Sequence, residues 1–163
     1  MKFFQFIALA IFALYAGIVC ADVSKTDAYQ PGMGEIMGAT QMRHAKLWFA
    51  GKAENWELAR YELGEIREGL NDAVKYYPTF KGAPVSAMLD KFTSTPLSNL
   101  AQSIEEKNGS KFAKAFDDLT SACNSCHEAA EHEYIVIKRP SDNQYSNQEF
   151  AVGKHKQMSD RRN

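Results

Sequence analysis

Apolar side chains recur every three or four residues along most of the chain, the spacing that places them on one face of a helix. The pattern is clearest over residues 56–77, where Pro78 ends it. Its apolar positions are Trp56, Ala59, Leu63, Ile66, Leu70, Ala73 and Tyr77, while Glu57, Glu62, Glu65, Arg67, Glu68 and Lys75 occupy other faces. This arrangement is typical of a helix in a bundle.

An earlier helix is predicted over residues 31–50. The centre of its apolar face holds Met37, Gln41 and His44 in place of Leu or Val, and Arg43 points away from that face. Side chains of this kind at the centre of a core-facing stripe make the helix a candidate for chemistry as well as packing.

Two further helical segments follow, and the sequence interrupts the first of them. Residues 85–92 predict a short helix, after which Thr95 has the position of an N-cap with Pro96 at the first helical position. The last helix carries one apolar stripe of Phe112, Phe116, Leu119, Cys123 and Cys126. Residues suited to closing or capping these helices are Gly51, Asn55, Gly109 and Ser110.

The character of the chain changes after Glu133. Residues 134–137 form a short β-prone run, and a polar segment with a basic end at 154–163 follows. We therefore predict an all-α fold, an antiparallel four-helix bundle within residues 22–133. A C-terminal extension at 134–163 is expected to fold back over it.

Residues 1–21 have the pattern of a secretory signal peptide, with Lys2 before an apolar run and small residues before Asp22. The alternatives are an uncleaved N-terminal anchor and a lipoprotein acylated at Cys20. Export to the bacterial periplasm is the expectation. The exported chain then holds two cysteines, Cys123 and Cys126.

Composition narrows the functional classes further. The 163 residues are 45% apolar and 24% charged with a formal net charge of −1, values that suit a globular protein and give no field for nucleic acid. The chain also lacks a serine–histidine–acid set, a metalloprotease helix motif and a phosphate-binding loop. We expect a protein that is not an enzyme and does not bind nucleic acid.

The segment Cys123-Asn124-Ser125-Cys126-His127 has the C-x-x-C-H pattern of covalent haem attachment. Two thiols on one helical face can each add to a vinyl group of haem c, and the adjacent imidazole is then held where it can bind the iron. The sequence predicts one covalent haem, with His127 as proximal ligand.

Three other interpretations of this segment are a redox pair, a zinc site and a disulfide. A thioredoxin-like redox pair needs a βαβ setting, whereas the surroundings of Cys123 and Cys126 are helical. A structural zinc site needs four ligands, with His132 as the candidate fourth beside His127. A plain disulfide leaves His127 without a role.

The position of the motif near the end of the chain resembles the cytochrome c′ and cytochrome c-556 group. The resemblance covers roughly residues 33–130 and rests on Cys123, Cys126, His127 and the helical layout. It implies a four-helix bundle with haem on the last helix and the first helix over the distal face. Unlike that group, this chain continues for 36 residues after His127.

The resemblance leaves the sixth iron position open to several residues. Members of the c-556 type fill it with a methionine of the first helix, which Met37 matches, whereas cytochrome c′ leaves it empty. Met37 could also be ordinary core packing. His44 is a weaker candidate ligand or a buried histidine paired with Gln41, and Met33 is a further alternative.

The leading functional hypothesis is a periplasmic carrier of single electrons that serves unidentified redox partner proteins. The alternative is a five-coordinate haem protein that binds NO or CO for sensing or scavenging. A third reading makes the domain a subunit of a larger redox complex, docked through residues 134–137. Bundles of this type often dimerise through their first two helices, and the amphipathic second helix permits a homodimer.

Overall fold

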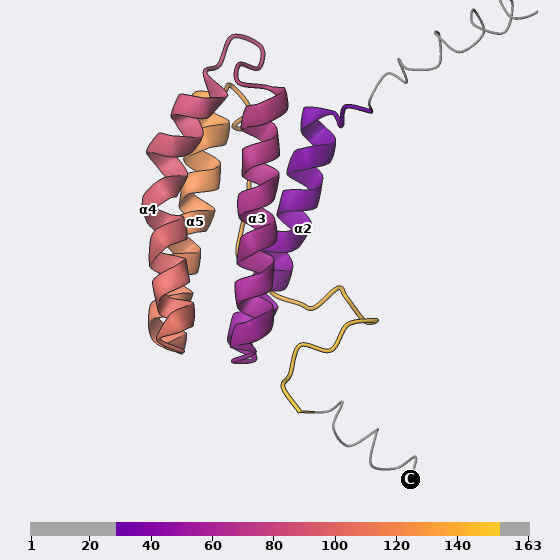
Figure 1. Cartoon of the computed structure of the whole chain (residues 1–163), viewed down its shortest axis with the longest axis vertical. Coiled ribbons are helices and arrows are strands. Elements are labelled where there is room, and N and C mark those ends of the chain that lie inside the picture. The colour runs from indigo at the N-terminus through magenta and orange to yellow at the C-terminus, as the bar shows by residue number, and fades with distance from the viewer. Residues whose placement is uncertain (1–28, 154–163) are drawn as a thin grey trace, which may run out of the picture. The chain divides into compact units, whose positions relative to one another are not determined.

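The computed structural model describes residues 29–153, and these residues form four helices and no strand. The helices are α2 (Met33–Lys52), α3 (Trp56–Tyr76), α4 (Val85–Glu105) and α5 (Gly109–Ala129). Figure 1 shows consecutive helices running in opposite directions, with α2 beside α3 and α4 beside α5. This arrangement confirms the predicted all-α four-helix bundle. The predicted signal peptide at 1–21 and the basic end at 154–163 lie outside the described residues.

The loops before α3 and α5 each end in an asparagine that caps the next helix. The Asn55 side chain accepts a hydrogen bond from the Leu58 N–H at 3.2 Å, which confirms its predicted role at the start of α3. At the start of α5 the cap is Asn108, which accepts from Lys111 N–H at 2.9 Å; the predicted cap, Ser110, lies inside the helix.

Gly51 does not close α2, as the sequence suggested, but lies buried inside that helix. A Cβ at this position would overlap the Cε1 and Cζ atoms of the Phe112 ring on α5. The glycine therefore permits close packing of the two helices, and the chain turns afterwards at Glu54, whose φ is 55°.

α4 is continuous, so the predicted break between residues 92 and 95 is wrong. Pro96 lies inside the helix, where its missing N–H leaves the carbonyl four residues earlier without a donor. The buried side chains stay on one helical face across it, as shown by Val85, Met88, Leu89, Thr93, Leu100 and Ile104. Packing of this uninterrupted face against α5 outweighs the local preference of Pro96 for a helix start.

The bundle holds two groups of buried apolar side chains. The larger group surrounds Phe112 and Phe116 of α5 and includes Trp48 of α2 and Leu100 of α4. The smaller group lies where α2 begins and α5 ends, with Ile36, Ala73, Val85 and Leu89 at its centre. Met33, Met37 and Cys126 pack against this smaller group. Three of the predicted candidate residues therefore lie at this end of the bundle.

Glu62 is buried in α3, although the helical pattern placed it off the apolar face. Its side chain is 1% exposed and lies 3.3 Å from the guanidinium of Arg43 on α2. Arg43 also contacts Glu65 at 2.9 Å. A buried carboxylate needs a partner of opposite charge, which Arg43 supplies between the two helices.

The residues after α5 run back along the bundle, as Figure 1 shows. Arg139 bonds Asp117 of α5 and its guanidinium stacks over the Trp48 ring at 4.3 Å. Farther on, Phe150 is buried against Phe49 of α2, and its carbonyl accepts a hydrogen bond from Asn55 at 3.1 Å. Within residues 29–153 no helix has both the length and the hydropathy to span a membrane.

Candidate functional site

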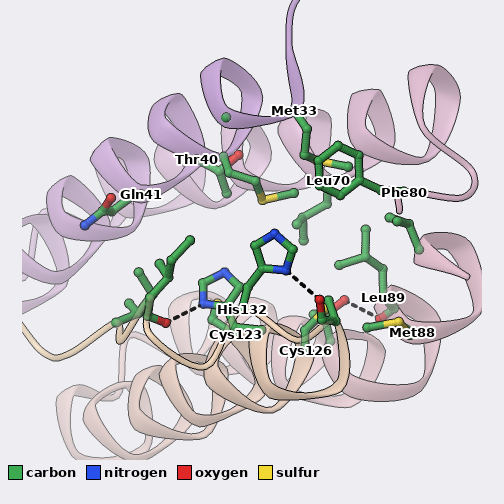
Figure 2. A pocket seen from close by; sticks show the side chains of 18 of the residues that line it. Met33, Thr40, Gln41, Leu70, Phe80, Met88, Leu89, Cys123, Cys126 and His132 are labelled. Atoms are coloured by element: carbon green, nitrogen blue, oxygen red, sulfur yellow. Dashed lines mark hydrogen bonds between the residues drawn. The ribbon is translucent and has the colours of Figure 1, made fainter. Parts of the chain in front are cut away.

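A cavity of about 340 Å³ lies among the smaller apolar group of the bundle and receives side chains from all four helices. This volume is in the range of small-molecule and cofactor sites. Figure 2 shows Met33, Thr40 and Gln41 on one side of the cavity and Cys123 and Cys126 on the other. The cavity brings residues of α2, the first described helix, together with residues of α5, the last one.

All three residues of the C-x-x-C-H motif that carry chemistry line this cavity. Cys123, Cys126 and His127 lie on the last two turns of α5, and both cysteines are free thiols. Burial raises the pKa of Cys123 to about 12, and it also raises the pKa of Cys126. Both thiols therefore stay neutral beside the apolar wall of the cavity.

The imidazole of His127 is held by the chain that follows α5. Its Nδ1 lies 2.8 Å from the carbonyl oxygen of Ile135. A carbonyl can only accept a hydrogen bond, so Nδ1 is the donor, and in the neutral tautomer Nε2 has the lone pair. Nε2 is therefore the ring nitrogen of His127 that could bind a metal.

The opposite wall of the cavity comes from α2. Met33 and Met37 both line it and both are half-buried. Their thioethers are soft donors that suit iron and copper sites. A third methionine, Met88 of α4, also lines the cavity, although no sequence pattern singled it out.

His44 also lines the cavity, but its side chain is buried and already has a hydrogen-bond partner. Its Nε2 is 2.9 Å from Thr120 Oγ1 of α5, and its ring packs on Phe116 with centroids 4.3 Å apart. Gln41, the partner considered from the sequence, is exposed at the rim of the cavity. Burial lowers the pKa of His44 to about 4, so its ring is neutral.

The sequence analysis did not predict that two further residues line the cavity. Phe80, in the loop before α4, and His132, just after α5, both line it, and their rings face each other at 6.0 Å between centroids. Figure 2 shows His132 among the cavity residues. Its Nδ1 donates to the carbonyl of Ala130, so in the neutral ring Nε2 is the nitrogen without a proton.

Comparison with known proteins found no family model, no curated protein and no solved structure that matches the chain. Among residues 29–153, no three His, Cys, Asp or Glu side chains are grouped to hold a metal ion.

Proposed function

We propose that the protein is a monohaem c-type cytochrome that carries single electrons and is similar to the cytochrome c-556 type. The observation that carries the proposal is the shared cavity, where Cys123, Cys126 and His127 of α5 face Met37 of α2. The motif alone suggests haem attachment, and the cavity adds an apolar space for the macrocycle beside it.

The residues present fit a covalently held haem. The Cys123 and Cys126 thiols are free, and each would form one thioether bond to a vinyl group. His127 would bind through Nε2, the nitrogen that its hydrogen bond to Ile135 leaves available. When bound, the haem supplies one-electron redox chemistry, and the packed bundle keeps its ligands in place between redox states.

Met37 is a better distal candidate than His44. A ligating histidine would have to give up its bond to Thr120, which is buried in the core. The thioether of Met37 packs beside the cavity and needs no such exchange. A thioether ligand favours ferrous iron and raises the reduction potential, which suits an electron carrier in the periplasm, the compartment that residues 1–21 indicate.

The test is an absorption spectrum of the exported protein, produced with the haem-attachment machinery and recorded oxidised, reduced, and reduced with carbon monoxide. We expect a low-spin spectrum that carbon monoxide hardly changes. Met37→Ala should then become high-spin and bind the gas, whereas His44→Ala should stay low-spin.

Met88→Ala is the matched control, because Met88 lines the same cavity from α4 and should keep the wild-type spectrum. A wild-type spectrum that is high-spin and shifts with carbon monoxide would contradict ligation by Met37. It would favour the five-coordinate protein that binds NO or CO.

A further inference from the structure

α5 ends in a tight turn that begins at the proposed haem ligand itself. The His132 N–H donates to the carbonyl of His127 at 2.8 Å, and the Glu131 N–H donates to that of Glu128 at 3.1 Å. Glu131 has φ 58°. This is the Schellman arrangement, in which one left-handed residue reverses the chain after a helix.

The turn sends the chain back toward the side chain of His127. Ile135 donates its N–H to the carbonyl of His132 at 2.9 Å, and its own carbonyl accepts from Nδ1 of His127 at 2.8 Å. The segment 132–135 therefore forms hydrogen bonds with both the backbone carbonyl and the imidazole of His127.

Asn124, a variable position of the C-x-x-C-H motif, holds the next part of this segment. Its Nδ2 donates to the carbonyl of Ile137 at 2.8 Å, and its Oδ1 accepts from the Ile137 N–H at 2.7 Å. One amide side chain thus pairs with both backbone groups of a single residue. Arg139 adds a third anchor through its bond to Asp117, 2.9 Å from Nε to Oδ1.

Burial of apolar side chains does not account for this placement. Tyr134, Ile135 and Val136 are 72%, 41% and 71% exposed, and only Ile137 of the β-prone run is half-buried, so the run contributes little to the core. The segment contacts the end of α5 chiefly through backbone groups, and one of them reaches the imidazole of His127.

We propose that residues 130–139, the proximal strap, position His127 as an iron ligand and strengthen its donation to the metal. This inference rests on the proposed function. A carbonyl bonded to Nδ1–H fixes the ring orientation and the tautomer and makes the other nitrogen more basic. A more basic ligand stabilises ferric iron, so the strap lowers the reduction potential. The C-terminal extension thereby offsets part of the increase that Met37 would give.

The test is Asn124→Ala in the full-length holoprotein, which removes both bonds to Ile137 and keeps both cysteines and His127. Asn99→Ala, an exposed asparagine on α4, is the matched control. We expect about a tenfold change in the redox equilibrium toward ferrous iron, which is about 59 mV for one electron. The control should leave the potential unchanged.

A second measurement reports on the contact between the strap and His127 and does not depend on the reduction potential. The Nδ1–H proton of His127 should be protected from solvent exchange in the NMR spectrum of the wild type and lose that protection in Asn124→Ala. Ile137→Pro, which removes the N–H bonded to Asn124 Oδ1, serves as an independent variant and should act in the same direction.

An unchanged potential together with an unchanged Nδ1–H signal in both variants would overturn the proposal. Wild-type protein without haem would instead refute the proposed function, and the Nδ1–H signal would still report on the strap. Haem that is attached in all variants at one common potential would refute the strap alone.

Discussion

The Nε2 atom of His44 lies 2.9 Å from Thr120 Oγ1 and joins α2 to α5 inside the core. The hydroxyl of Thr120 donates to the carbonyl of Phe116 at 2.9 Å, so its oxygen is the acceptor for His44. Nε2 therefore carries the proton of a neutral ring. A charged imidazole in this place would be poorly solvated, which lowers the pKa of His44 to about 4.

This buried histidine predicts a loss of stability in mild acid. The folded state keeps His44 neutral down to a pKa of about 4, whereas the unfolded chain takes up a proton near its ordinary value of 6.5. The contribution is fully present above pH 6.5 and is lost as the pH falls toward 4, by about 3 kcal/mol.

His44→Gln should flatten this decline, as measured by urea unfolding between pH 7 and pH 4. Burial raises the pKa of Glu62, which works in the opposite direction, but Glu62 is present in both proteins and its effect cancels. Parallel pH profiles for the two proteins would contradict the assignment.

Gly51 and Gly64 offer a matched pair of glycine substitutions within helices. Gly51→Ala should lower the free energy of unfolding by about 1–3 kcal/mol, because the new methyl group overlaps the Phe112 ring. Gly64→Ala meets no atom within 4 Å and should raise it by about 0.5–1 kcal/mol. Denaturant unfolding measures both, and equal effects of one sign would refute the close contact of α2 with α5.

Arg43 and Arg60 separate a buried ion pair from an exposed one. Arg43→Ala leaves the Glu62 carboxylate, 1% exposed, without its partner and should cost about 3 kcal/mol. Arg60→Ala removes the exposed pair with Glu105 and should change stability little. Thermal unfolding at neutral pH compares them; a larger loss for Arg60→Ala would show that Glu62 is not buried as described.

Glu131 is expected to be less favourable than glycine at its position. Glu131→Gly should stabilise the fold by about 1 kcal/mol, because φ 58° strains a residue with a Cβ. Glu128→Gly, inside α5, should instead destabilise by about 1 kcal/mol. Stabilities from urea unfolding decide this, and a destabilised Glu131→Gly protein would argue against the turn that begins the proximal strap.

The helices could be predicted from the sequence because their apolar positions repeat with the helical period. α3 is the best example, since Trp56 begins it and Pro78 follows its end. The failures involve contacts between helices. Pro96 is a strong local signal for a helix start, yet the face buried against α5 continues across it. The helical period of the apolar positions also could not predict the burial of Glu62, because that burial depends on Arg43 of another helix.

For the candidate site, the sequence identified the motif but not its surroundings. The C-x-x-C-H spacing identified Cys123, Cys126 and His127, and the resemblance to the c-556 type pointed to Met37; the structure brings these four residues to one cavity. His132 was considered only as a zinc ligand. The contact of His127 with Ile135 was not predicted, because it passes through a backbone carbonyl that any residue provides.

The most direct test of the account is the intact mass of the exported full-length protein under denaturing conditions. Wild-type protein should retain the added mass of one haem, because thioether bonds survive unfolding. A Cys123→Ala, Cys126→Ala double variant should show the polypeptide mass alone. A wild-type protein at its bare polypeptide mass, produced with the haem-attachment machinery, would contradict the assignment of a c-type cytochrome.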